Sequence, residues 1–243
     1  EWVGLKHFTT FFSSVFFVRV LKNTLILSLY SVIFGFPAPI IFALLLNELD
    51  NEYYKKVIQV VSYMPNFIST VVISGIIIDF VASDGVITGM LVNIGFLKEA
   101  KNLLSVPEYF RTIMVLSDLW QQVGFGSILF LAALTGIDQE LYEAAEVDGA
   151  SKGKQFFKIT LPMLSPTTFY LCIVRLIAAF KAFSAINIMG SGGNAPSLVT
   201  EIYANAFTSY KFGYASAEAW VLVAVILVVT AIQFWGQKKW VHY

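Results

Sequence analysis

The residues of this chain whose types could support chemistry are few and widely spaced. The two histidines, His7 and His242, lie near opposite ends of the sequence, and neither has a cysteine or a second histidine close by. Because a zinc site needs several nitrogen or sulfur ligands at short spacings, the sequence does not support a metal centre. The single cysteine, Cys172, lies in an apolar run and is interpreted as a packing residue. No nucleophile motif or cluster of histidine and carboxylates predicts an enzyme.

A nucleotide-binding loop is not supported either. Such a loop reads G-x-x-x-x-G-K-[ST], in which the final hydroxyl holds magnesium. The stretch Gly149 to Gln155, GASKGKQ, has three residues between its glycines and ends in Gln, and the stretch GSGGN at 190–194 has no lysine. We therefore expect that neither stretch binds ATP.

Ionisable residues inside apolar runs are the remaining candidates, because a charge in a membrane span is costly enough to suggest a function. Asp118 and Lys181 are expected at similar depth on antiparallel helices, where they form either a structural ion pair or part of a polar path. Gln121 and Gln122 follow Asp118 at helical spacing, and amides with an aromatic platform can hold a sugar, although Gln in a span often only joins helices. The candidates for a solute path are Asp118, Gln121, Gln122, Phe125, Arg175 and Lys181.

These residues must be positioned by membrane-spanning helices. The chain has 57% hydrophobic and 13% charged residues, against about 25% charged in soluble domains. With 16 basic and 16 acidic residues it has no net charge, so a nucleic-acid partner is not indicated. Apolar runs near the roughly 20 residues that cross a bilayer predict five spans in one domain covering 1–243. The predicted spans are about 24–46, 57–80, 112–136, 166–189 and 217–237.

One charged stretch, residues 138–165, interrupts the apolar sequence. Good helix formers precede Asp148-Gly149, which is a strong turn signal, and Ser151 is suited to cap a second helix. The pattern predicts a short helix, a sharp turn and a second short helix outside the lipid. It suits a handle for another protein, but it is equally compatible with a solvated amphipathic loop. Lys and Arg are equally numerous in the loops of both sides, so the positive-inside rule does not orient the chain.

The sequence EAAEVDGA, followed by KITLP and a further proline, resembles the EAA loop of binding-protein-dependent ABC importer permeases. Four further stretches resemble the carbohydrate-uptake subfamily, namely VGLKHF, LKNTLILSL, FKAFSAINIMGSGGNAP and KKWVHY. Two others resemble the LplB-like polysaccharide branch of that subfamily, namely FGFPAPIIFALLLNEL and SYMPNFIS. Where relatives often read T-x-GGP, this chain has GSGGNAP. The fixed positions of the loop pattern are Glu143, Ala144, Ala145, Asp148, Gly149, Ala150, Ile159, Leu161 and Pro162.

This resemblance implies an all-α membrane protein with a MetI-like permease core of five transmembrane helices, preceded in relatives by one further N-terminal helix. It implies a bacterial cytoplasmic membrane location and places the EAA loop, 138–165, in the cytoplasm as a coupling helix. The expected contacts with the ATPase are Glu143, Ala144, Ala145, Asp148 and Gly149.

The implied function is the non-catalytic permease subunit of an ATP-driven importer that moves a sugar or oligosaccharide by alternating access. The implied partners are a second homologous permease, a dimer of cytoplasmic ATPases that carries ATP and magnesium, an extracellular or periplasmic solute-binding protein and membrane lipid. No cofactor is expected in this chain. The alternatives are a permease for another solute, such as glycerol phosphate, or an ion-coupled secondary transporter, which would leave the loop without a purpose.

Overall fold

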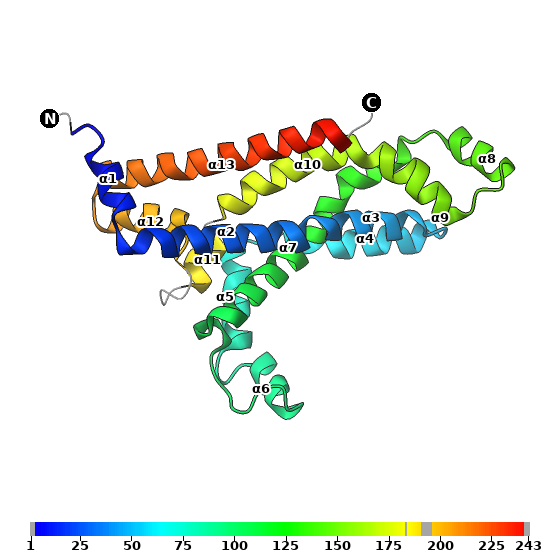
Figure 1. Cartoon of the computed structure of the whole chain (residues 1–243). Coiled ribbons are helices and arrows are strands. Elements are labelled where there is room, and N and C mark those ends of the chain that lie inside the picture. The colour runs from blue at the N-terminus through cyan, green and yellow to red at the C-terminus, as the bar shows by residue number, and fades with distance from the viewer. Residues whose placement is uncertain (1–2, 183, 191–195, 241–243) are drawn as a thin grey trace. The chain divides into compact units, whose positions relative to one another are not determined.

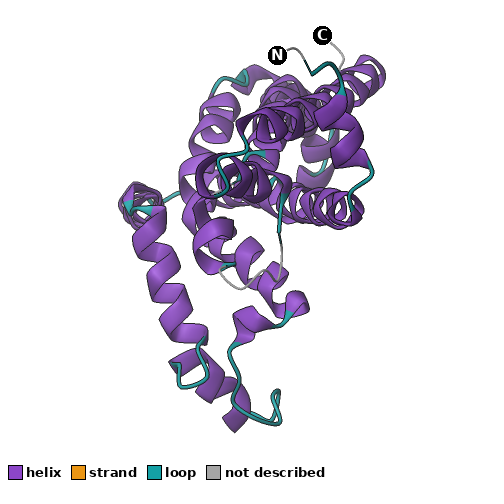
Figure 2. Cartoon of the chain, turned by 90° about the vertical axis from the view of Figure 1, so that its left-hand side faces the viewer, coloured by secondary structure: helices purple, strands orange, loops and turns teal. Residues whose placement is uncertain are grey.

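The computed structural model describes residues 3–182, 184–190 and 196–240, with only the backbone described at 184 and 237–240. Residues 183 and 191–195 of FKAFSAINIMGSGGNAP, and the last three residues of the closing tail, lie outside the described residues. The described chain is helical and has no strand (Figure 2). The helices labelled in Figure 1 are α1 Lys6–Phe12, α2 Val15–Gly35, α3 Pro37–Asn47, α4 Glu52–Phe67, α5 Thr70–Val81, α6 Val86–Asn93, α7 Pro107–Thr135, α8 Gln139–Val147, α9 Lys152–Gln155, α10 Leu161–Phe180, α11 Ser184–Met189, α12 Leu198–Tyr203 and α13 Phe212–Trp240.

Three short turns of other helix types complete the secondary structure. The turn η1, Leu103–Ser105, is a 3₁₀-helix that precedes α7. The turns η2, Phe156–Thr160, and η3, Ala204–Thr208, are π-helical. Such π-helical turns are rare and are often found at functional sites.

Five helical runs among the described residues are long and apolar enough to cross a membrane. This finding confirms the predicted all-α membrane fold with five spanning helices. The five runs are Val15–Asn47, Thr70–Asn93, Pro107–Thr135, Lys152–Met189 and Phe212–Gly236.

Two of the spans predicted from hydropathy, 57–80 and 166–189, are interrupted by helix ends in the structure. Within the expected span 57–80, α4 ends at Phe67, and the Ser69 side chain accepts a hydrogen bond from the Val71 N–H at 3.3 Å to begin α5. Within the expected span 166–189, α10 ends at Phe180, and Lys181 lies in the following turn. A small polar cap or a single lysine barely changes the mean hydropathy of a window, so the average does not reveal these breaks.

The first apolar run is also divided, between Gly35 and Pro37. Proline has no N–H to donate and its fixed φ suits the first turn of a helix. Accordingly α2 ends at Gly35 and α3 begins with Pro37 at its first position. Pro65 and Pro166 instead lie inside α4 and α10, as neighbouring groups in a membrane bundle allow.

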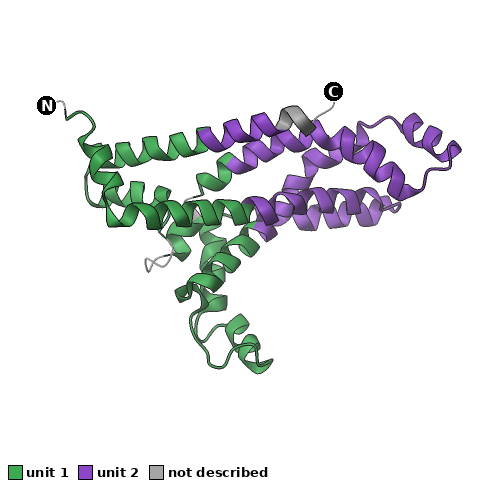
Figure 3. Cartoon of the chain, in the orientation of Figure 1, with its two compact units in different colours: residues 1–31, 67–118, 177–227 green, residues 32–66, 119–176, 228–243 purple. Residues whose placement is uncertain are grey.

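The chain divides into two compact units, which are coloured separately in Figure 3. Unit 1 comprises residues 1–31, 67–118 and 177–227. A hydrogen bond from the Leu198 N–H to the Thr24 hydroxyl, 2.8 Å long, joins α12 to α2 within it. Its apolar core is built from α2, α5, α7, α11 and the segment around η1, through the buried residues Leu27, Val81, Leu97, Leu103, Leu104, Phe110, Met114, Ile186 and Met189.

Unit 2 comprises residues 32–66, 119–176 and 228–243. The backbones of α4 and α7 approach so closely in it that a Cβ at Gly124 would lie 2.1 Å from the Ser62 carbonyl oxygen. A larger residue is therefore excluded at this helix crossing. The core of unit 2 lies where α3, α7 and α10 meet and consists of Ala43, Leu46, Phe130, Leu131, Leu134, Ile137 and Leu164.

Candidate functional site

The charged stretch folds as a helical hairpin within unit 2 (Figure 1). Its first arm is α8, which Asp138 caps by accepting a hydrogen bond from the Glu140 N–H at 3.0 Å. An aspartate at this position satisfies one of the free N–H groups at the helix start and favours the positive end of the helix dipole. The first arm therefore begins at a residue fixed by local chemistry.

The turn after α8 depends on Gly149. Its φ is +71°, a left-handed conformation that costs a residue with a Cβ roughly 1–2 kcal/mol. The Gly149 N–H donates to the Glu146 carbonyl at 2.9 Å, and the Ala150 N–H donates to the Ala145 carbonyl at 2.8 Å. These two bonds form a Schellman motif, which satisfies the last carbonyls of α8 and reverses the chain.

The second arm begins at Ser151, whose hydroxyl accepts a hydrogen bond from the Lys154 N–H at 3.4 Å. This confirms the predicted capping role of Ser151. The arm then runs through α9 and η2 into α10 without a break, and the Leu161 N–H donates to the Phe156 carbonyl five residues back. A single helical rod therefore joins the hairpin to the fourth candidate span.

One face of α8 is open to the surroundings. Four residues share one side of the helix because they are spaced three, one and three positions apart, namely Glu140, Glu143, Ala144 and Val147. All four are exposed, and Val147 has 88% of its surface accessible. Val147 thus gives this face an apolar side chain beside the exposed carboxylates of Glu140 and Glu143. The sequence reasoning missed Val147, although it is an apolar residue directly before the Asp-Gly turn.

The opposite face of α8 is anchored to unit 2. The Tyr142 hydroxyl and the Thr160 hydroxyl form a 2.8 Å hydrogen bond between α8 and η2. The ring of Tyr142 packs against the core of unit 2. A cavity of about 400 Å³ lies beside this anchor. It is lined by the ends of α3 and α7 and by the hairpin, and the lining includes Glu48 and Lys152. Tyr142 therefore connects a helix without buried residues to the packed helices.

The predicted contact residues lie together on this hairpin. Glu143, Ala144, Asp148 and Gly149 are exposed, whereas Ala145 is half-buried toward the anchored side. No group of three His, Cys, Asp or Glu side chains that could hold a metal is found in the described part of the chain. With its caps, turn and anchor, the hairpin can present a rigid surface and transmit a displacement to α10.

Two of the polar candidates for the solute path, Asp118 and Lys181, belong to unit 1. The Asp118 carboxylate accepts a hydrogen bond of 3.5 Å from the Ser31 hydroxyl, which joins α7 to α2. Lys181 is exposed, and its backbone N–H bonds to the Ile177 and Ala178 carbonyls at the end of α10. Lys181 thus follows the helix end instead of lying within the helix.

The other four candidates, Gln121, Gln122, Phe125 and Arg175, belong to unit 2. Gln121 is buried, Gln122 is half-buried and 43% of Phe125 is exposed, so the three residues have different surroundings along α7. The Arg175 guanidinium lies against Gly35 of α2, where a Cβ would be 2.6 Å from its Nη2 atom. Gly35 therefore makes room for the arginine head group inside the apolar helices.

Known proteins similar to this chain include two permeases of Bacillus subtilis (strain 168). Protein LplB is 37% identical over 238 residues, which cover 95% of this chain and 74% of LplB. The polygalacturonan/rhamnogalacturonan transport system permease protein YteP is 34% identical over 236 residues, which cover 96% of this chain and 73% of YteP.

Two crystal structures of a bacterial alginate ABC transporter have the same fold. The structure of the transporter involved in import of the acidic polysaccharide alginate superposes with a TM-score of 0.87 and 35% identity, covering 98% of this chain and 85% of that chain. The complex with an alginate pentasaccharide-bound periplasmic protein gives a TM-score of 0.84 and 36% identity, covering 95% and 81% of the two chains. A family model described as "Binding-protein-dependent transport system inner membrane component" matches residues 35–241. The chain therefore belongs to the family of binding-protein-dependent inner-membrane transport components, the ABC importer permeases.

Proposed function

We propose that this chain is the non-catalytic permease subunit of an ATP-driven saccharide importer, and that the hairpin 138–165 is its cytoplasmic contact with the ATPase. The observation that carries the proposal is the open face of α8 with Glu143, Ala144 and Val147. A helix whose remaining side is anchored by Tyr142 can be pushed as a unit. Closure of the ATPase around ATP then moves α10 and converts the permease between its inward-open and outward-open states.

The proposed assembly contains a second homologous permease, a dimer of ATPases that bind ATP and magnesium, and a solute-binding protein. Support for the last partner comes from the alginate transporter, which was crystallised with its periplasmic protein. We propose no cofactor in this chain. The GASKGKQ stretch forms the turn and second arm of the hairpin, and its residues are used for capping and for the Schellman motif. ATP is then held outside this chain.

The proposed solute is an oligosaccharide or polysaccharide fragment. YteP is described as a permease for polygalacturonan, and the alginate transporter imports an acidic polysaccharide. Cationic side chains attract carboxylates, amides donate and accept hydrogen bonds, and aromatic faces stack on sugar rings. The residues that we propose to contact the solute are Asp118, Gln121, Gln122, Phe125, Arg175 and Lys181.

Site-directed cross-linking tests the contact with the ATPase. Because Cys172 is the only cysteine, a Cys172→Ser chain provides a clean background. In this background, Glu143→Cys and Val147→Cys are co-expressed with the neighbouring transporter genes and treated with a short bifunctional thiol reagent. We expect cross-links to the ATPase from both positions, with yields that change when ATP is added. The matched control is Lys98→Cys. Lys98 is exposed and lies in a loop predicted on the opposite side of the membrane, so this variant should give no cross-link to the ATPase.

Two results would contradict the proposed function. Labelling of Val147→Cys from outside sealed cells by a membrane-impermeant thiol reagent would place the hairpin on the wrong side of the membrane. Uptake that follows an ion gradient and continues after ATP depletion would instead support a secondary transporter. Glu143→Lys should abolish ATP-dependent uptake while the chain still inserts into the membrane.

A further inference from the structure

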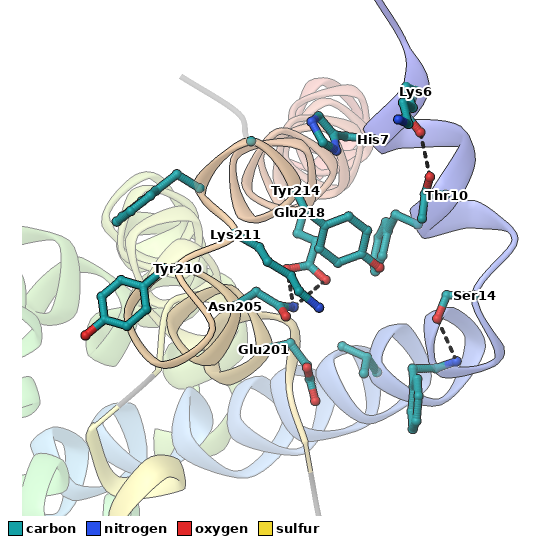
Figure 4. A pocket seen from close by; sticks show the side chains of 15 residues that line it. Lys6, His7, Thr10, Ser14, Glu201, Asn205, Tyr210, Lys211, Tyr214 and Glu218 are labelled. Carbon is teal, nitrogen blue, oxygen red and sulfur yellow. Dashed lines mark hydrogen bonds between the residues drawn. The ribbon is translucent and has the colours of Figure 1, made fainter. Parts of the chain in front are cut away.

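A second cavity, of about 940 Å³, lies in unit 1, which does not contain the hairpin. It is bordered by α1, the start of α2, the segment α12–η3 and the start of α13, and Figure 4 shows the side chains that line it. The function proposed above does not use this cavity. Its lining combines acids, bases and aromatic rings, which is unusual beside apolar helices.

The floor of the cavity is a buried carboxylate. Glu218 of α13 is 2% exposed, and both of its oxygens accept hydrogen bonds from the Asn205 amide, at 3.2 and 3.0 Å (Figure 4). A carboxylate can accept about four hydrogen bonds, yet Asn205 is its only donor within residues 3–182, 184–190 and 196–240. No described cation forms an ion pair with Glu218 either, so a cationic ligand would favour the ionised form of this buried acid.

Aromatic rings and a second acid surround this carboxylate. Phe11 and Tyr214 pack edge to face with centroids 6.0 Å apart, and His7 lies 6.5 Å from the Tyr214 ring. Glu201 is half-buried in the same lining. Ammonium groups bind aromatic faces and carboxylates together, so the interior of the cavity suits the ammonium group of a ligand.

Two lysines of the lining carry the opposite charge. Lys6 and Lys211 both line the cavity and are exposed. Lysine is a common ligand of phosphate groups. A ligand that has both an ammonium group and a phosphate would therefore meet complementary charges in this lining.

The position of the cavity along the helices identifies the source of such a ligand. Its lining comes from the segments where two candidate spans begin, at Val15 and at Phe212. The ends of spans lie at the membrane surface, where phospholipid head groups are found. Apolar side chains at the adjoining end of α1 and start of α2 are exposed and can contact acyl chains, namely Phe12, Val15, Phe16 and Val18.

We propose that this cavity binds the head group of a phosphoethanolamine phospholipid, with the ammonium at Glu218 and the phosphate between Lys6 and Lys211. The acyl chains then follow the exposed apolar side of α2. The bound lipid occupies the space between α1 and α13 and ties α1 to the first and fifth candidate spans. This inference concerns membrane anchoring and does not depend on the identity of the transported solute.

Native mass spectrometry of the purified complex, reconstituted with defined lipids, tests the proposal. The unmodified protein should retain phosphatidylethanolamine in preference to phosphatidylglycerol, which has the phosphate but no ammonium. Glu218→Gln should remove this preference, and Lys6→Ala combined with Lys211→Ala should weaken retention of both lipids roughly tenfold. Lys98→Ala and Glu99→Gln change exposed charges elsewhere in unit 1 and should leave retention unchanged.

Three outcomes would overturn the proposal. The first is equal retention of the two lipids by the unmodified protein. The second is binding of soluble phosphoethanolamine without retention of the lipid, which would identify a free metabolite as the ligand. The third is a fall in melting temperature of Lys211→Ala with unchanged lipid preference, which would show that Lys211 itself neutralises Glu218. The two lysines are exposed, so their replacement tests the site even if Glu218→Gln fails to fold.

Discussion

Replacement of Gly149 by alanine tests whether the conformation of the hairpin turn controls coupling. No heavy atom lies within 4 Å of the place that a Cβ on Gly149 would occupy, so the substitution introduces no clash within the chain. Its cost therefore comes from the φ of +71°, roughly 1–2 kcal/mol for alanine. This free energy corresponds to a decrease of about 5- to 30-fold in the population of the native turn relative to opened conformations.

Two measurements follow this effect. Hydrogen exchange of the Gly149 and Ala150 amides reports the opening of the Schellman motif, because these amides donate to the Glu146 and Ala145 carbonyls. We expect their protection to fall by about the same 5- to 30-fold in Gly149→Ala. ATP-driven uptake by the reconstituted complex should fall with it. Asparagine tolerates left-handed φ better than alanine, so Gly149→Asn should retain most of the protection.

The matched control is Gly153→Ala, in α9 of the same hairpin. Gly153 has no positive φ, and a Cβ at this position would have no neighbour within 4 Å. Alanine favours a helix by about 1 kcal/mol over glycine, so this variant should exchange no faster than the original chain. Equal protection in the two alanine variants would refute the reasoning. Lost uptake in Gly149→Asn with intact protection would show that the bound ATPase, and not the backbone, requires glycine at this position.

Three further substitutions test other contacts. Tyr142→Phe removes the 2.8 Å bond to Thr160 but keeps the ring, so the free energy of unfolding should fall by only about 0.5–1.5 kcal/mol while the ATP hydrolysed per solute transported rises. Val147→Asp places a charge on the open face of α8, and pull-down of the ATPase should fail although the permease still inserts. Gly124→Ala brings a Cβ 2.1 Å from the Ser62 carbonyl, and the melting temperature should fall; an unchanged value would disprove the close helix crossing.

The sequence predicted the parts of the site that depend on local chemistry. The Asp148-Gly149 turn and the Ser151 cap follow from backbone preferences and neighbouring hydrogen bonds, which are encoded within a few residues. The five-helix membrane fold follows from long apolar runs in the same way. These features do not require knowledge of distant contacts.

Features that depend on tertiary packing were not predicted. The anchor between Tyr142 and Thr160 joins residues 18 positions apart on two helices, and no local pattern indicates it. Glu218 was not singled out as a buried acid, although the predicted fifth span, 217–237, includes it near its start. Its carboxylate accepts hydrogen bonds from Asn205, which lies in η3, 13 residues earlier in the chain.

The π-helical turn at Phe156–Thr160 also determines the rotational setting of α10. Each residue of an α-helix advances the direction of the side chains by about 100°, so one residue more or fewer in this turn rotates every later position by that angle. Deleting a single residue within 156–160 would leave the composition almost unchanged and yet turn Arg175 away from Gly35. The orientation of Arg175 within a candidate membrane span is thus set by an irregularity several helical turns earlier in the same rod.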